Sequence, residues 1–141
     1  MAKAYAAVVK QDSKSDRTRQ RILDAAALSF RRHGFASVTL KNIAERAGLQ
    51  AGSLYYHFDS KEELVEAVLT AGVENAFAAT REAVEALGSG AEPLARLRVA
   101  IAAHLRVILT ESDYSSANLR IFGQLPEAIR GRHLKLQREY G

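Results

Sequence analysis

Apolar side chains recur every three or four residues along most of this 141-residue chain, and this spacing constrains the fold more than any other feature. An α-helix places residues three and four apart on one face, so the pattern predicts amphipathic helices that share a core. No segment alternates apolar and polar residues for long, and no Asn-Gly or Asp-Gly pair marks a hairpin. We therefore predict an all-α fold.

Capping residues and helix breakers divide this pattern into seven predicted helices. Ser15 or Asp16 is expected to cap the first helix, because a side-chain oxygen there accepts the free N–H groups of the first turn, and Gly34 is expected to end it. Ser60 is expected to cap a long fourth helix, with Glu63 completing a capping box. The predicted helices cover approximately residues 16–33, 40–47, 51–58, 61–87, 94–108 and 113–122, and the seventh begins near Pro126.

Positive charge is concentrated in the first part of the chain. Residues 1–60 contain ten Lys or Arg and five Asp or Glu, whereas residues 61–141 contain ten and eleven. This distribution favours a polyanion-binding head attached to a body with another task. A solvated basic tail is the alternative interpretation.

Several classes of protein do not fit this composition. The absence of cysteine excludes disulfides, thiolate catalysis and cysteine-based zinc sites. The apolar run AYAAVV is too short for a membrane span or a signal peptide, so a soluble cytoplasmic protein is expected. The four histidines have no paired ligand spacing, and no acid, base or nucleophile set is apparent. We therefore expect no metal, no cofactor and no enzymatic activity, with a small helical enzyme as a remote alternative.

The most informative stretch is TLKNIAERAGLQAGSLYYHFDSKEEL, residues 39–64. Thr39 is a candidate cap for the first of two short helices, which a tight turn at Gly48 joins to the second. Glycine suits such a turn because it adopts a positive φ without a Cβ clash. Ala44 and Ala47 are small enough for the two helices to cross closely. The layout predicts a helix-turn-helix whose second helix enters the DNA major groove.

Side-chain chemistry around this unit also suits DNA. Gln50, Ala51 and Ser53 begin its second helix, where Gln pairs with adenine, Ser donates or accepts, and an Ala methyl contacts thymine. Other side chains have donors for the phosphate backbone, either later in the unit or at the start of the preceding helix: Tyr55, Tyr56, His57, Lys61, Thr39 and Lys41.

The segments RILDAAALSFRRHGFASVTLKNIAERAG and GLQAGSLYYHFDSKEELVEAVL closely resemble the TetR family of bacterial repressors, over about residues 17–69. The resemblance implies a DNA-binding domain at residues 16–62 and part of a helical effector-binding and dimerisation domain at residues 63–141, after a flexible arm of residues 1–15. It implies phosphate contacts from Thr39, Tyr55, His57 and Lys61, and positions at or near bases for Lys41, Gln50, Ala51, Ser53 and Tyr56, with Tyr56 alternatively a packing residue.

The resemblance also implies a mode of control. Such proteins are homodimers that bind a palindromic double-stranded operator and release it when a small-molecule effector binds the body. Members usually continue with two further long helices that form the dimer interface, so this chain is expected to be truncated or incompletely represented, or to dimerise in another way. A DNA-binding module without a working ligand sensor is the alternative.

Candidate effector residues lie in the second half of the chain. His104 shares the apolar stripe of Ile101 and Ile108, where it is either a ligand contact or a core or interface histidine. The segment FGQLPEAIRGRHLKLQREYG, which contains Phe122 and Arg130, loosely resembles the seventh helix of TetR members that sense fatty acyl or steroid-derived CoA thioesters. Its basic residues suit CoA phosphates, or they form a charged outer face.

Overall fold

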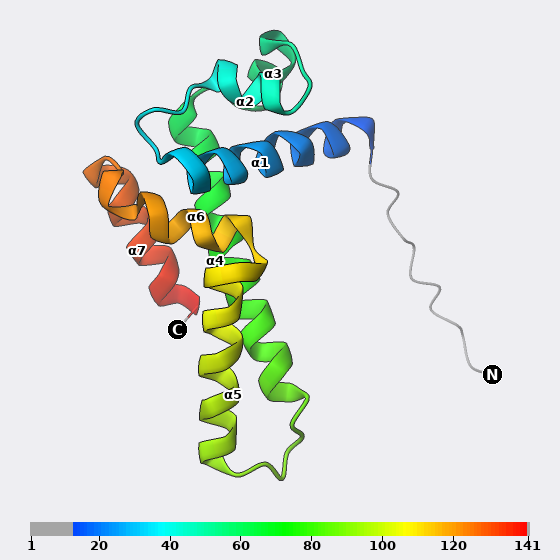
Figure 1. Cartoon of the computed structure of the whole chain (residues 1–141), viewed down its shortest axis with the longest axis vertical. Coiled ribbons are helices and arrows are strands. Elements are labelled where there is room, and N and C mark those ends of the chain that lie inside the picture. The colour runs from blue at the N-terminus through cyan, green and yellow to red at the C-terminus, as the bar shows by residue number, and fades with distance from the viewer. Residues whose placement is uncertain (1–12, 141) are drawn as a thin grey trace, which may run out of the picture.

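The computed structural model describes residues 13–140, which form helices joined by short turns and contain no strand in that range (Figure 1). The all-α prediction is therefore confirmed. In chain order the elements are α1 (Lys14–His33), α2 (Leu40–Arg46), α3 (Ala51–His57), α4 (Lys61–Glu85), α5 (Pro93–Arg106), the π-helical η1 (Val107–Glu111), α6 (Asp113–Ile121), the 3-10 turn η2 (Phe122–Gln124) and α7 (Glu127–Tyr140). Within residues 13–140, no helix is both long and apolar enough to cross a membrane.

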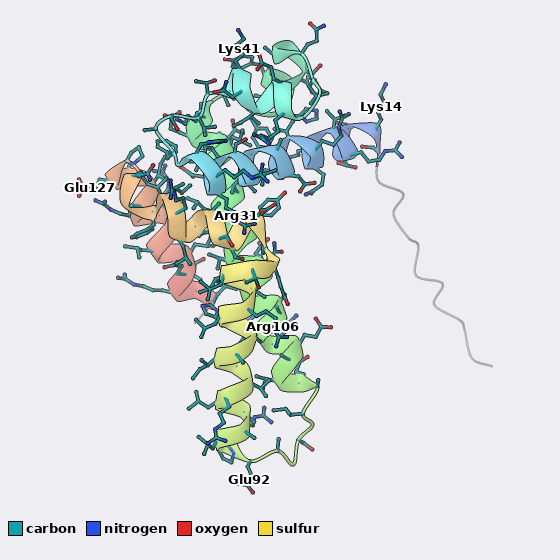
Figure 2. The ribbon with its side chains drawn as sticks, in the orientation of Figure 1. Lys14, Arg31, Lys41, Glu92, Arg106 and Glu127 are labelled. Atoms are coloured by element: carbon teal, nitrogen blue, oxygen red, sulfur yellow. The ribbon has the colours of Figure 1, made fainter. Side chains whose placement is uncertain are left out.

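The long helix α4 connects the two ends of the molecule. At one end α1, α2 and α3 pack together, and at the other end α5 turns back along α4 (Figure 1). Figure 2 places Lys41 and Glu92 at these opposite ends. Helix α6 packs against both α1 and α4, and α7 packs against α4. The predicted DNA-binding helices are thus separated along α4 from the α4–α5 hairpin.

The first helix begins earlier than predicted. Ser13, rather than Ser15 or Asp16, is the N-cap, and Asp16 is its capping-box partner. The Ser13 hydroxyl accepts a hydrogen bond from the Asp16 backbone N–H at 3.1 Å, and the Asp16 carboxylate accepts one from the Ser13 N–H at 3.0 Å. The sequence SKSD offers several capping residues in succession, so local pattern alone did not select the correct one. Residues 1–12 of the predicted arm lie outside the described residues.

The capping box predicted at the start of α4 forms only in part. The Ser60 hydroxyl accepts from the Glu63 N–H at 3.1 Å, as expected. The Glu63 carboxylate, however, accepts from the Asp59 N–H at 2.7 Å rather than from the Ser60 N–H. At the start of α2, Thr39 and Asn42 form a complete box that the sequence analysis did not anticipate.

The predicted fifth helix contains an irregular segment. Helix α5 ends at Arg106, and Val107–Glu111 adopt a π-helical turn before Ser112 caps α6. The Ser116 hydroxyl donates to the Ile108 carbonyl at 2.8 Å, which satisfies one backbone group of this turn. Such turns are frequently found near functional sites, and Ile108 lines a cavity described below.

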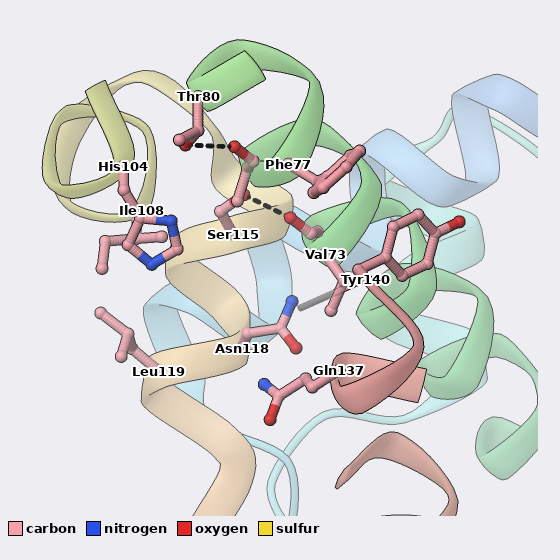
Figure 3. Close-up of a pocket in the computed structure, with 12 residues that line it drawn as sticks. Val73, Phe77, Thr80, His104, Ile108, Ser115, Asn118, Leu119, Gln137 and Tyr140 are labelled. Carbon is pink, nitrogen blue, oxygen red and sulfur yellow. Dashed lines mark hydrogen bonds between the residues drawn. The ribbon is translucent and has the colours of Figure 1, made fainter. Parts of the chain in front are cut away.

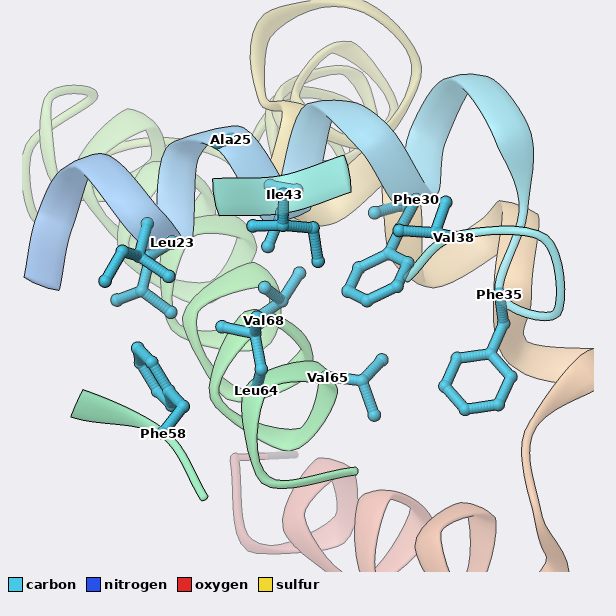
Figure 4. Close-up of a cluster of buried hydrophobic side chains, with 14 of the residues drawn as sticks. Leu23, Ala25, Phe30, Phe35, Val38, Ile43, Phe58, Leu64, Val65 and Val68 are labelled. Carbon is cyan, nitrogen blue, oxygen red and sulfur yellow. The ribbon is translucent and has the colours of Figure 1, made fainter. Parts of the chain in front are cut away.

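A continuous apolar core joins the N-terminal helices to α4 (Figure 4). Ile22, Ile43, Leu54 and Leu64 come from four different helices, and each has no exposed surface. Because burial of apolar surface is the main favourable term in folding, this shared core fixes α1, α2 and α3 on the first turns of α4.

Helix α6 is also tied to α1 by polar contacts. The Tyr114 hydroxyl donates to the Asp24 carboxylate. Burial, together with this hydrogen bond, raises the pKa of Tyr114. Arg31 forms an ion pair with Asp113. The first turns of α6 are therefore held against α1.

Candidate functional site

The turn between α2 and α3 has the geometry predicted from its glycine. Gly48 has a φ of 68°, in the left-handed region that favours glycine. The Leu49 N–H donates to the Ala44 carbonyl at 2.9 Å, which closes the turn. Leu54 of α3 is fully buried in the angle between the helices, and Leu49 is partly buried beside the core. This is the packing that a helix-turn-helix requires.

The opposite side of α3 is exposed. Gln50 is the N-cap residue, and Ala51 and Ser53 occupy the first turn; all three are exposed. Tyr55 and Tyr56 have exposed fractions of 53% and 81%. Because large aromatic side chains are mostly buried in monomeric proteins, two exposed tyrosines on a seven-residue helix favour a surface that contacts another molecule.

The beginning of α1 lies beside α3, which the sequence analysis did not anticipate. A shallow hollow lies between the two helices, lined from α1 by a lysine and two hydroxyl residues and from α3 by Tyr56 and its neighbours. Hydroxyl and ammonium groups next to a recognition helix suit phosphate contacts. The basic charge of the N-terminal segment was the only sequence feature that pointed to phosphate contacts from the start of α1. The lining residues are Lys14, Ser15, Thr18, Gly52, Ser53, Tyr56 and His57.

The remaining predicted contact residues flank α3. Thr39 and Lys41, at the start of α2, are both exposed, and the Thr39 hydroxyl also donates to the Asn42 side chain at 2.8 Å. His57 is partly buried, and its ring meets the Tyr56 ring edge-on with centroids 5.1 Å apart.

Lys61 is held against the segment between α1 and α2. Its ammonium nitrogen lies 4.2 Å from the centroid of the Phe35 ring and 3.5 Å from the Ala36 carbonyl oxygen. Partial burial lowers the pKa of Lys61 below its ordinary value, while nearby Glu62 opposes this shift. The cation is thus positioned rather than free, as a fixed phosphate contact requires.

A second candidate site is a half-open cavity of about 450 Å³ enclosed by α4, α5, η1, α6 and α7 (Figure 3). Its wall is largely apolar, with aromatic rings from Phe77 and Tyr140. Two of the predicted effector residues, His104 and Ile108, line it together. Besides His104 and the Tyr140 hydroxyl, the polar wall residues are Thr80, Ser115, Asn118 and Gln137.

The other predicted effector residues lie elsewhere. Ile101 is 51% exposed on the surface of α5, and Arg130 is partly exposed on α7. Phe122 packs against the buried His133 ring, with centroids 6.0 Å apart. None of these three is among the residues that line the described cavity.

His133 is the buried polar residue of α7. It is 4% exposed, its Nε2 lies 3.2 Å from the Gln137 side-chain nitrogen, and its Nδ1 has no hydrogen-bond partner among the described residues. Burial lowers the pKa of His133 from its ordinary value. The imidazole is therefore neutral in the folded protein over a wider pH range than in the unfolded chain.

We expect this burial to reduce stability at mildly acidic pH. The unfolded chain takes up a proton on His133 as the pH falls through about 6.5, whereas the folded protein resists protonation until lower pH. Stability is therefore lost from about pH 6.5 downward until the pH passes the folded pKa. His133→Gln should show a smaller loss between pH 7.5 and 5 in urea titrations, and His33→Gln, at an exposed site, should match the parent protein. Equal pH dependence in all three proteins would contradict this expectation.

Comparison with known proteins agrees with the helix-turn-helix geometry. Residues 22–68 match the family described as "Bacterial regulatory proteins, tetR family". This helix-turn-helix region belongs to the TetR family. It is 41% identical over 80 residues to the HTH-type transcriptional repressor KstR2 of Mycobacterium tuberculosis, a match that covers 57% of this chain and 38% of that protein.

Solved structures of TetR-family proteins match a larger part of the chain. The structure of the ketosteroid transcriptional regulator KstR2 of Mycobacterium tuberculosis has a TM-score of 0.69 at 30% identity, and covers 86% of this chain and 61% of that one. The TetR family regulator PfmR from Thermus thermophilus has a TM-score of 0.68 at 28% identity, with 85% and 64% coverage. The matched part of this chain thus spans less than two thirds of the length of either structure.

Proposed function

We propose that this TetR-family chain is a sequence-specific DNA-binding transcriptional regulator, and that it represses by binding a palindromic operator as a homodimer. In this proposal α3 enters the major groove and the start of α1 holds the adjacent phosphates. The exposed face of α3, with Gln50, Ala51 and Ser53 at its N-terminal end and Tyr56 beyond them, is the observation that carries it. Similarity to the repressor KstR2 supports the same function.

Gel-shift titration with the DNA upstream of the gene, repeated at several salt concentrations, tests the proposal. Specific binding should exceed binding to scrambled DNA by at least about 10³-fold. Affinity that never exceeds that for scrambled DNA would contradict a sequence-specific regulator. Equal affinity for an isolated half-site and for the full palindrome would contradict the dimer.

Lys61→Ala should weaken binding to specific and scrambled DNA alike. If its positioned ammonium neutralises one phosphate, the slope of log K against log salt should become shallower by about one unit. Fluorescence anisotropy with labelled DNA measures this slope. Lys135→Ala, at an exposed position on α7, serves as a matched control and should leave the slope unchanged.

Gln50→Ala should have a different effect from Lys61→Ala. Because Gln50 begins the recognition helix, its loss is expected to relax the preference for one base pair, at about 1–3 kcal/mol, while the salt slope stays the same. A panel of single-base operator variants measures this preference. Uniform weakening over the whole panel would contradict base contact by Gln50.

We further propose that a small-molecule effector in the α4–α7 cavity releases the operator. Helix α6 contributes Ser115, Asn118 and Leu119 to the cavity and joins α1 through Asp113 and Tyr114. A ligand that moves α6 therefore also acts on α1, and a differential affinity for the two arrangements supplies the coupling. A titrated effector should lower operator affinity and raise the thermal unfolding temperature together.

The effector's chemical class is part of this proposal. A CoA thioester would need cations for its phosphates, and the residues that line the cavity include no Lys or Arg among those described. On α7, Arg132 forms an ion pair with Glu66 and His133 is buried. A lipid-derived molecule without phosphates suits the largely apolar wall better than an acyl-CoA held entirely inside.

A further inference from the structure

The hydroxyl groups in the wall of the α4–α7 cavity have already donated their protons to the protein. The Ser115 hydroxyl donates to the Gly72 carbonyl, and the Thr80 hydroxyl donates to the Ala76 carbonyl, each at 2.8 Å (Figure 3). A hydroxyl has one proton, so after donation only its lone pairs remain available. Both groups therefore present hydrogen-bond acceptors to a ligand.

The Asn118 side chain has also used its hydrogen-bond donors within the protein. Its side-chain nitrogen donates to the Leu69 carbonyl at 3.3 Å and to the Tyr114 carbonyl at 3.0 Å, which uses both amide hydrogens and fixes the orientation of the amide. Its Oδ1 is buried and has no hydrogen-bond partner among the described residues. Figure 3 shows the amide facing Gln137, an exposed and unbranched side chain whose displacement gives a ligand access to that oxygen.

Tyr140 completes the set at the rim of the cavity. Its hydroxyl donates to the Glu74 carboxylate at 3.2 Å, so only the lone pairs of its oxygen remain available, as acceptors. Donors are fewer: the Gln137 amide, which already lies 3.2 Å from His133 Nε2, and the imidazole of the exposed His104. Acceptors thus outnumber donors in a wall whose described residues include no Lys, Arg, Asp or Glu.

We infer that the cavity binds an apolar molecule that carries O–H or N–H hydrogen-bond donors, and that it discriminates against carboxylates. This inference rests on the proposed role of the cavity as the effector site. A donor on the ligand satisfies Asn118 Oδ1, whereas a carboxylate meets mostly other acceptors and loses its hydration without a Lys or Arg in the described wall to replace it.

Four naphthalene derivatives with the same ring system test this selectivity. Isothermal titration calorimetry measures the affinity of the full chain, without DNA, for each of four compounds: 2-naphthol, 2-naphthylmethylamine, 2-methoxynaphthalene and 2-naphthoate. We expect 2-naphthol or the amine to bind about five- to tenfold more tightly than 2-methoxynaphthalene, and 2-naphthoate to bind at least about tenfold more weakly than the better donor. The naphthol and amine arms distinguish a hydroxyl donor from an ammonium donor.

A substitution assigns the selectivity to this wall. Thr80→Val removes one acceptor and keeps the shape, and because the Thr80 hydroxyl bonds within its own helix the fold should persist. It is expected to reduce the preference for the donor probe over 2-methoxynaphthalene. Thr110→Val removes an equivalent hydrogen bond, to the Arg106 carbonyl, outside the cavity and should leave the preference unchanged.

Three results would overturn the inference. The first is that 2-naphthoate binds as tightly as the donor probes, and the second is that the donor probes and 2-methoxynaphthalene bind with equal affinity. The third is that no probe binds at concentrations up to its solubility limit. Gel shifts on the same protein preparations test the proposed regulator function separately from the ligand selectivity of the cavity. Loss of operator binding with intact donor selectivity contradicts the regulator alone, whereas carboxylate preference with intact operator binding contradicts the inference alone.

Discussion

Phe58→Ala is expected to lower the free energy of unfolding by about 3–5 kcal/mol. Phe58 is 1% exposed, and Figure 4 shows its ring facing Leu23 of α1 and Leu64 of α4. Its backbone N–H donates to the Leu54 carbonyl at the end of α3, so the ring anchors α3 to the core. Truncation removes the transfer free energy of the ring and leaves a cavity in well-packed surroundings. Urea unfolding followed by circular dichroism measures the change.

Tyr56→Ala is the matched control for Phe58→Ala. The two aromatic residues are two positions apart, but Tyr56 is 81% exposed. Its truncation should change stability by no more than about 0.5 kcal/mol and should weaken operator binding. A loss of stability equal to that of Phe58→Ala would mean that Tyr56 packs as a core residue and would contradict its proposed contact with DNA.

Gly72→Ala is expected to destabilise the protein by about 1–3 kcal/mol, although alanine is intrinsically the better helix former. A Cβ at Gly72 would lie 2.0 Å from the Asn118 side-chain nitrogen and 2.7 Å from the Tyr114 backbone oxygen. Asn118 cannot move away without breaking its hydrogen bonds to the Leu69 and Tyr114 carbonyls. The substitution therefore forces α4 and α6 apart. Thermal and urea unfolding should both detect the loss.

The same substitution at Gly131 should have the opposite sign. Gly131 lies within α7, and a Cβ there meets nothing within 4 Å. Alanine should therefore stabilise the helix by about 0.5–1 kcal/mol through its lower conformational entropy in the unfolded chain. Equal effects at Gly72 and Gly131 would show that helix propensity, rather than the close approach of α4 and α6, determines the cost.

Regular local features made much of this fold predictable. The helical spacing of apolar residues predicted α1, in which Ile22, Ala26 and Phe30 are fully buried, and Gly48 predicted the turn of the helix-turn-helix. Helix periodicity and a positive φ depend on residues close in sequence, so they leave a clear local pattern. The exact cap of α1 and the π-helical turn after Arg106 were missed, because neighbouring residues offered near-equivalent alternatives.

The surroundings of individual side chains were harder to predict. Lys61 was expected near a phosphate, but its position over the Phe35 ring depends on a residue 26 places earlier in the chain. Ile101, Phe122 and Arg130 were grouped with His104 as effector candidates, yet they do not line the same cavity as His104. Sequence spacing gives the face of a helix but not the neighbour which that face meets.

The sequence by itself determined the helical class, the helix-turn-helix and the candidate contact residues of α3, because each is specified within one or two helical turns. Only the tertiary structure decided that α6 approaches α4 at Gly72, that the start of α1 lies beside α3, and that the Ser115 and Asn118 side chains donate to carbonyls of α4 in the cavity wall. These features arise from contacts between helices distant in the chain or from the resulting hydrogen bonds, and packing rather than local propensity sets them.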